Sequence, residues 1–246
     1  KKFKLAEVIH YRVLKVVGIG ESAVDDKIGY LIANSSNPTV GVLALPGQVD
    51  VRIAAKAANR DQAMSLIAPV EADVRGVLGN AIFAADRETM EDVVGRLLRA
   101  RNKTVAVYED LTCGNLSERL QAASSESFGA GVICNREVAI RTLLTHGRNP
   151  AGTDALIQDP EALTDELAWS VRHQSACDFG LALHAVTDSD TTIQNLARGQ
   201  SYVALTDGEK FVRRLSTSAG RGQYDRSRMT LNALDLLRTA LLEGMG

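Results

Sequence analysis

The sequence predicts an α/β protein of two domains, a small α+β domain followed by a larger α/β domain. Apolar residues make up 45% of the 246 residues and aromatic residues only 4%, so the core should consist of Val, Leu, Ile and Ala. Strand-like and helix-like patterns alternate after residue 85, which is typical of an α/β domain. The charge also changes there. Residues 1–84 hold 10 of the 28 basic and 8 of the 30 acidic residues, a net +2, which leaves 18 and 22, a net −4, for residues 85–246.

The first domain, residues 1–84, is expected to hold two helices and a β-hairpin. Pro46-Gly47 separates two alternating apolar runs, a pattern typical of a hairpin turn. Gly18-Ile19-Gly20 forms a packing turn before the first helix, which Ser22 is expected to cap. In chain order the expected elements are a strand at 12–17, a helix at 23–33, strands at 40–45 and 49–54, and a helix from residue 61.

The second domain, residues 85–246, is expected to hold a mostly parallel sheet covered by helices, because strands alternate with helices along it. In such sheets, ligands bind beyond the carboxyl ends of the strands. Thr164 is expected to cap the helix that it opens. The expected strands are 104–108, 131–134 and 179–186, with a hairpin of 202–205 and 211–216. The expected helices are 90–100, one through 116 and 120, 137–144, 164–176 and 227–243.

Composition excludes several classes of protein. A net charge of −2 gives no electrostatic reason to expect nucleic-acid binding. No apolar run approaches the ~18–20 residues that span a membrane. Three cysteines without a CxxC pair argue against a disulfide framework and for a reducing compartment, so a cytoplasmic protein is expected. The four histidines lie far from the cysteines in sequence, so no metal is expected, and no cofactor is expected either. The chain does not begin with Met, so part of the natural protein is expected upstream.

The segment Val107–Leu116 carries most of the chemistry. It leaves a buried strand and enters a helix, so its backbone N–H groups are expected to point toward whatever binds there. Glu109, Asp110, Thr112 and Cys113 place two carboxylates, a hydroxyl and a thiol within five residues. A purely structural interpretation is also open, in which Asp110 or Thr112 caps the helix and Cys113 is a small buried residue.

This segment resembles the Ala-Glu-Ser-Cys-Thr-Gly-Gly signature of the CinA family's C-terminal domain, a nicotinamide mononucleotide deamidase. Similar family motifs occur at 124–131, 162–168, 177–182, 199–205 and 226–234. Upstream, 13–22 with Asn37-Pro38 resembles the family's KH-type middle domain. The resemblance therefore implies a KH-like domain followed by a deamidase-type α/β domain. It also implies self-association, as a dimer, and an upstream molybdopterin-binding-like domain.

The resemblance implies hydrolysis of the carboxamide of nicotinamide mononucleotide by a serine nucleophile, with a tyrosine and a lysine moving protons. This sequence departs at each of these positions. Asp110 stands at the serine, Cys134 at the tyrosine and Ala139 at the lysine, while Cys113 replaces the first signature glycine. The family's Thr-Gly-x-x-Gly-Pro loop aligns with 184–189, which lacks its glycines and its proline, and such a loop should not allow close backbone approach to a ligand.

Two hypotheses for the second domain follow. In the first, the deamidase domain is catalytically degenerate and serves in oligomerisation or in sensing a pyridine nucleotide. In the second, it is an active amidohydrolase that uses Asp110 or Cys113, with Thr112 in the same catalytic loop, although no basic partner is evident. An anionic Asp110 would also repel a phosphate-bearing substrate. The expected ligand-binding positions are Glu109, Gly114, Cys134, Asn135 and Arg226.

Two weaker expectations concern other regions. RNA binding by the first domain is a third hypothesis, although the sequence has no Gly-x-x-Gly clamp with basic flanks. His184 ends a buried strand and is expected to be a core histidine with its hydrogen bonds satisfied rather than a ligand-binding residue.

Overall fold

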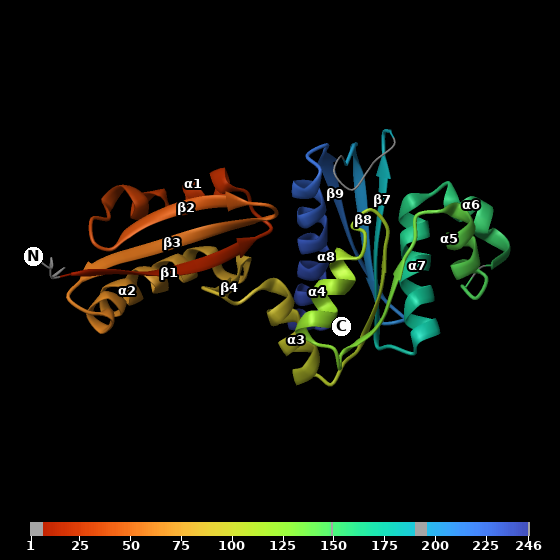
Figure 1. Cartoon of the computed structure of the whole chain (residues 1–246), viewed down its shortest axis with the longest axis horizontal. Coiled ribbons are helices and arrows are strands. Elements are labelled where there is room, and N and C mark those ends of the chain that lie inside the picture. The colour runs from red at the N-terminus through yellow and green to blue at the C-terminus, as the bar shows by residue number, and fades with distance from the viewer. Residues whose placement is uncertain (1–6, 149, 190–195, 246) are drawn as a thin grey trace, which may run out of the picture. The chain divides into compact units, whose positions relative to one another are not determined.

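The computed structural model describes residues 7–148, 150–189 and 196–245. By its internal contacts the chain divides into two compact units, Lys1–Thr89 and Met90–Gly246. Both units combine helices with one sheet (Figure 1), as the sequence predicted.

The first unit is a four-stranded antiparallel sheet with two helices. Its elements are β1 (Val8–Val17), α1 (Glu21–Asn34), β2 (Thr39–Leu45), β3 (Gln48–Ala57), α2 (Arg60–Leu78), the 3-10 helix η1 (Gly79–Ala81) and β4 (Ile82–Ala85). The strand order is β2-β3-β1-β4. Leu14, Val51 and Ile53 lie on one face of the sheet and form a core with Ile28 of α1 and Ile67 of α2. The alternation of apolar and polar residues along β3 explains this one-sided burial.

Two expectations for the first unit need correction. Ser22 does not cap α1, because the helix begins at Glu21 with Gly20 at the N-cap position and has no side-chain cap there. Helix α2 begins at Arg60, where Asn59 accepts a hydrogen bond from the Gln62 backbone. Strand β4 was not predicted, because four residues are too few to show a period.

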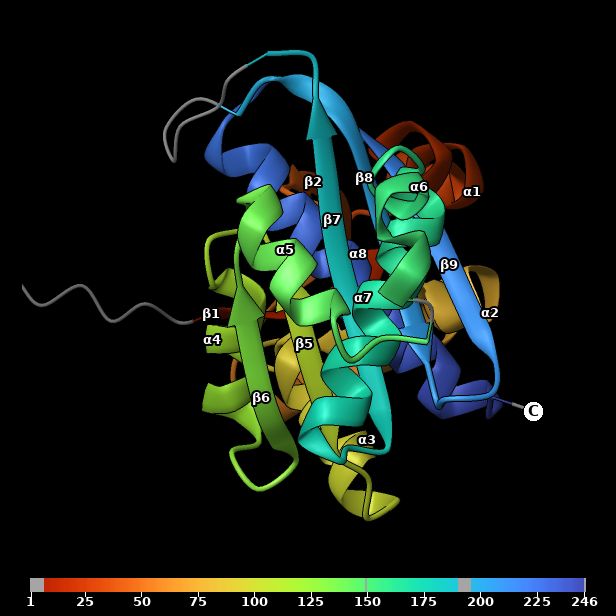
Figure 2. The same cartoon turned by 90° about the vertical axis from the view of Figure 1, so that its right-hand side faces the viewer.

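The second unit is a five-stranded sheet between two groups of helices (Figure 2). Its elements are α3 (Met90–Ala100), β5 (Val105–Glu109), α4 (Asn115–Ala123), β6 (Phe128–Ile133), α5 (Glu137–Leu144), η2 (Pro150–Gly152), α6 (Thr153–Ile157), α7 (Pro160–Ser175), β7 (Phe179–Thr187), β8 (Arg198–Thr206), β9 (Phe211–Ala219) and α8 (Gln223–Glu243). The order is β6-β5-β7-β8-β9. The pairs β6–β5 and β5–β7 are parallel, and β7–β8 and β8–β9 are antiparallel, so the predicted hairpin makes the sheet a mixed one.

Helices α5 and α7 cover one face of this sheet, and α3, α4 and α8 lie on the other. Tyr108, Ala182 and Ala204 form a core with Leu167 and Val171 of α7. Continuous apolar runs such as β5, which is buried along its whole length, are expected of strands covered on both faces.

Helix α7 starts earlier than predicted, which corrects the role given to Thr164. The helix begins at Pro160 with Asp159 as its N-cap. Thr164 is therefore one turn inside the helix, where it is buried and its hydroxyl donates to the Pro160 carbonyl at 2.6 Å. Similarly, α8 begins at Gln223 rather than Ser227, so Arg226 lies in its first turn.

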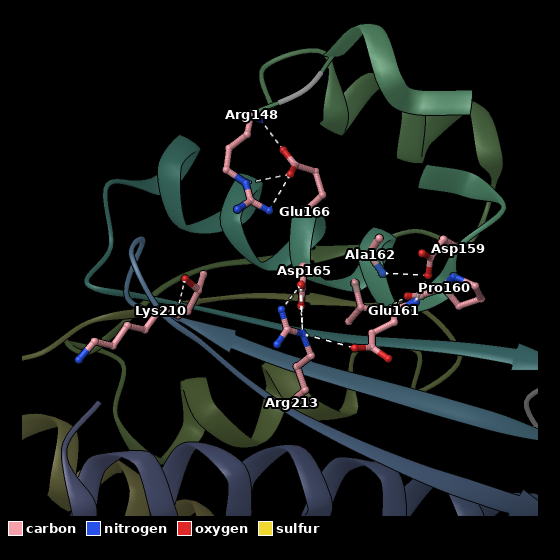
Figure 3. A network of polar contacts seen from close by, with 11 residues as sticks. Arg148, Asp159, Pro160, Glu161, Ala162, Asp165, Glu166, Lys210 and Arg213 are labelled. Atoms are coloured by element: carbon pink, nitrogen blue, oxygen red, sulfur yellow. Dashed lines mark hydrogen bonds and ion pairs between the residues drawn. The ribbon is translucent and has the colours of Figure 1, made fainter. Parts of the chain in front are cut away.

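Ion pairs fix α7 to its surroundings (Figure 3). Glu166 is buried and accepts from the backbone N–H of Arg148 and, at 2.9 Å, from its Nε. Arg213 of β9 donates to Asp165 from Nε to Oδ1 at 2.9 Å and from Nη2 to Oδ2 at 2.5 Å. Bidentate pairs of this kind set orientation as well as distance. They tie the helix to the loop after α5 and to the last strand.

Candidate functional site

Glu109, the last residue of β5, accepts hydrogen bonds from the first turn of the next helix, α4. Its side chain is fully buried. The carboxylate accepts from the backbone N–H of Leu116 at 3.0 Å, from that of Ser117 at 2.7 Å and from the Thr112 hydroxyl at 2.5 Å. These N–H groups belong to the first turn of α4, and each would otherwise need a partner. The expectation that they point toward a ligand is wrong for Leu116 and Ser117, because Glu109 occupies them.

The start of α4 also corrects the purely structural interpretation of the signature segment. Gly114 stands at the N-cap position with φ 93° and gives no side-chain cap. Neither Asp110 nor Thr112 is therefore the N-cap. Cys113 has φ 57° and is exposed, rather than a small buried residue, and its thiol contacts the Leu111 carbonyl oxygen at 3.5 Å.

The Asp110 carboxylate is buried and has three hydrogen-bond partners. One oxygen lies 2.8 Å from Nδ1 of His184 and accepts from the Ala185 backbone N–H at 3.1 Å. The other accepts from the Leu111 N–H at 2.5 Å. Asp110 thus has an imidazole partner that the sequence analysis did not find.

Strand register explains why these residues meet. Glu109 pairs with Ile133 of β6 on one side and with Leu183 of β7 on the other. One residue further along these three adjacent parallel strands lie Cys134, just after β6, Asp110, just after β5, and His184, which is still within β7. His184 in turn pairs with Tyr202 of β8. The row lies at the carboxyl edge of the parallel strands, where α/β sheets bind ligands.

Tyr108 lies under this row, and the sequence analysis did not single it out. Its side chain is fully buried, and its hydroxyl donates to the Cys134 carbonyl at 2.7 Å. Burial, together with the charge of Asp110, raises the pKa of the Tyr108 phenol. Burial also raises the pKa of the Cys134 thiol, with Asp110 adding to the effect and the Tyr108 hydrogen bond opposing it. Both groups therefore stay protonated near neutral pH, and Cys134 is a poor nucleophile.

The remaining predicted positions differ in their burial and in their contacts with this edge. Arg226 is buried, and its Nε donates to the Leu111 carbonyl at 2.6 Å, which brings the start of α8 to the signature loop. Asn135 is exposed where β6 ends, and Ala139 is half-buried in the first turn of α5. In the part of the chain that the structure describes, no three His, Cys, Asp or Glu side chains form a group that could hold a metal ion. Among the same residues, no helix has the length and apolar composition needed to cross a membrane.

The fold and this edge define an α/β protein of two units, and comparisons with known proteins give its family. Residues 11–84 match the family model "Damage-inducible protein CinA KH domain", and residues 87–241 match "CinA C-terminal domain". The chain belongs to the CinA family, which confirms the resemblance seen in the sequence.

Relatives agree with this assignment. The chain is 37% identical over 241 residues to a CinA-like protein of Thermosynechococcus vestitus, covering 96% of this chain and 57% of the relative. It is 33% identical over 244 residues to a putative competence-damage inducible protein of Thermoanaerobacter pseudethanolicus, covering 98% and 58%. The chain thus spans somewhat more than half the length of the curated relatives it matches.

Solved structures support the fold of part of the chain. A CinA superfamily protein from Klebsiella pneumoniae 700603 matches with a TM-score of 0.53 at 18% identity, covering 63% of this chain and 99% of that one. A competence or damage-inducible protein from Enterobacter asburiae gives the same TM-score and coverage at 19% identity.

Proposed function

We propose that the second unit is a degenerate deamidase-like domain, which binds a pyridine mononucleotide but does not hydrolyse its carboxamide. The observation that carries this proposal is the state of Asp110, at the position where the family resemblance places the nucleophile. Both of its oxygens accept hydrogen bonds, from Leu111, Ala185 and His184. A carboxylate held in this way has its lone pairs directed at fixed donors and its charge stabilised, so it is a weak nucleophile.

The surroundings of Asp110 include an imidazole, that of His184, but they lack two other parts that the family resemblance implies for an amidase. Acyl transfer needs donors for the oxyanion, and Glu109 already accepts from Leu116 and Ser117 at the start of α4. Ala139, at the position of the family's lysine, has no group that can move a proton. These two requirements of the reaction are thus absent together.

Other contacts support ligand binding without hydrolysis. The Asp110 charge is stabilised by two backbone N–H groups and an imidazole, so it repels a phosphate less than an unpaired carboxylate would. Arg226 adds a buried guanidinium beside the same loop, and a guanidinium suits an anionic ligand. From the family resemblance we also propose that the domain forms a dimer, which would give it a second role in assembly.

Two measurements on the whole chain test the proposed function. Calorimetric titration with nicotinamide mononucleotide and its acid should detect binding, and an ammonia assay with the amide should detect no turnover. The same assays on Asp110→Ala and Cys113→Ala serve as controls. Turnover by the wild type that either substitution abolishes would contradict the proposal.

Cys113 carries a second candidate function, a thiol-dependent amidohydrolase. The observation in its favour is that its thiol is exposed at the signature loop, two residues before α4 begins. If this function is correct, Cys113→Ala should remove ammonia release. Asp110→Ala, which keeps Cys113, should retain it.

A further inference from the structure

We propose that Asp110 is a positioning residue for His184, and that Nε2 of His184 binds the carboxylate of an acidic pyridine mononucleotide. The inference rests on the proposed function, because it names the ligand of that same site. It gives the pair a role in specificity: the site should prefer the acid to the amide.

The orientation of His184 follows from the chemistry of its partner. An ionised carboxylate only accepts hydrogen bonds, and the Asp110 oxygen that faces His184 also accepts from the Ala185 backbone. Nδ1 of His184, 2.8 Å away, is therefore the donor. A carboxylate on one ring nitrogen fixes the ring and leaves the other nitrogen for a ligand.

Nε2 is the atom that this arrangement leaves available. Within the described residues, the His184 imidazole bonds only to Asp110, through Nδ1. Its side chain is 13% exposed, against 3% for Asp110, so His184 can be reached from solvent while Asp110 is covered. His184 lies within β7, where its ring contacts Asp110 and its backbone pairs with Tyr202 of β8, at the edge where a ligand is expected.

The negative charges at this edge are already stabilised by neighbouring donors. Its two carboxylates, Glu109 and Asp110, are stabilised by four backbone N–H groups, the Thr112 hydroxyl and the imidazole. Arg226 adds a positive charge at the same loop. An imidazole between Asp110 and a ligand carboxylate can carry a proton on each nitrogen and donate to both, and such charge-assisted bonds are the stronger ones.

The pair also replaces two family residues at once. By the family resemblance, position 110 is a serine and position 184 a threonine, in motifs that are 74 residues apart. Here both differ, and the two new side chains contact each other. The two changes together place a carboxylate and an imidazole at hydrogen-bond distance.

A purely structural link between β5 and β7 is the competing explanation, and two variants of His184 separate it from ligand binding. His184→Asn keeps a donor near the place of Nδ1 and removes Nε2. His184→Gln places an amide near Nε2 and gives up the bond to Asp110. A structural link predicts that Asn is the better tolerated in urea unfolding and that neither variant affects binding. Ligand contact predicts that Asn unfolds almost like wild type but binds poorly.

The experiment is calorimetric titration of the whole chain with nicotinic acid mononucleotide, nicotinamide mononucleotide and inorganic phosphate. Wild type should bind the acid at least tenfold more tightly than the amide or phosphate. His184→Asn should lose at least tenfold for the acid, and His184→Gln should lose less. His146→Asn, at an exposed histidine, is the matched control and should bind like wild type.

Nitrogen NMR of the histidine side chains tests the role of Asp110 directly. In wild type, Nδ1 of His184 should carry a proton before ligand is added, and Asp110→Asn should shift that proton toward Nε2 and weaken binding of the acid. Unchanged binding by His184→Asn, or equal affinity for acid and amide, would overturn the inference while leaving the proposed function intact. Failure of wild type to bind either mononucleotide would overturn the proposed function, and this inference with it.

Discussion

The first turns of helices α4 and α7 both have backbone N–H groups that need hydrogen-bond acceptors, and the two helices obtain those acceptors in different ways. In α7 the cap is local: Asp159 accepts from the N–H groups of Glu161 and Ala162, both at 3.2 Å, and Pro160 follows it (Figure 3). In α4 the cap is distant. Gly114 offers no side chain, and the fully buried Glu109, at the end of the preceding strand, accepts from the first turn instead.

The difference shows how groups at the edge of a sheet, where a ligand could bind, can stabilise the fold instead. An exposed cap such as Asp159 replaces water that could serve the same N–H groups. A buried cap cannot be replaced by water, so its removal leaves donors unsatisfied. Because Glu109 lies where strands meet a helix start, the groups that would bind an anion elsewhere hold the fold together here.

Removing the buried cap should give the largest effect. Glu109→Ala leaves two backbone N–H groups and the Thr112 hydroxyl without their acceptor, so the free energy of unfolding should fall by about 3 kcal/mol or more. Urea unfolding followed by the fluorescence of Trp169, the one tryptophan of the chain, reports on this unit. Glu109→Gln keeps one acceptor oxygen and should lose about half as much. If Glu109→Ala lowers the free energy of unfolding no more than removal of the exposed cap Asp159 does, the proposed difference between buried and exposed caps is wrong.

Helix α7 should instead depend on packing at Gly180 of β7. A Cβ there would lie 1.9 Å from the Ala168 carbonyl oxygen and 2.7 Å from the Arg172 Cβ. Gly180→Ala therefore forces the helix away from the strand and should cost about 2–3 kcal/mol in the same unfolding assay. Ser170→Ala is the control on the same helix, because this buried hydroxyl has no partner among the described residues. It should be neutral or slightly stabilising, and a loss as large as that of Gly180→Ala would contradict the packing argument.

The sequence alone was sufficient to predict an element where a local pattern of residues determines that element. Helices 90–100 and 137–144 have the predicted bounds, because their apolar residues recur with the helical period. It was insufficient where a contact depends on register. The Asp110–His184 pair joins residues 74 apart, and only the pairing of β5 with β7 brings them together. The available signal was that Asp110 follows one apolar strand and His184 comes late in another, since parallel strands end at the same edge.

The exposed cap should give a smaller effect than the buried one. Asp159→Ala removes the acceptor for Glu161 and Ala162, but water can take its place, so the expected loss is about 1 kcal/mol. Asp159→Ser retains a capping oxygen and should recover most of it, again measured by urea unfolding with Trp169 fluorescence. If Asp159→Ala costs as much as Glu109→Ala, burial does not set the difference between the two caps.

A third carboxylate, Asp178, extends the comparison to the start of a strand and to pH. It precedes β7 and accepts from the Thr104 backbone and hydroxyl, each at 2.9 Å, and from Lys103 at 2.8 Å. Burial alone would raise its pKa, but the bonds from Lys103 and Thr104 outweigh that effect, and the pKa is lowered from 3.8.

Because its pKa is lower in the folded state, Asp178 adds stability that is complete above the unfolded value and is lost as the pH falls through the folded value. The free energy of unfolding, measured between about pH 5 and pH 2, should therefore fall less steeply in Asp178→Asn than in wild type. The side chain is 33% exposed, so solvent screening keeps the difference at about 1 kcal/mol or less. Parallel pH curves for the two proteins would show that this partly exposed carboxylate at a strand start contributes nothing to the pH dependence of stability.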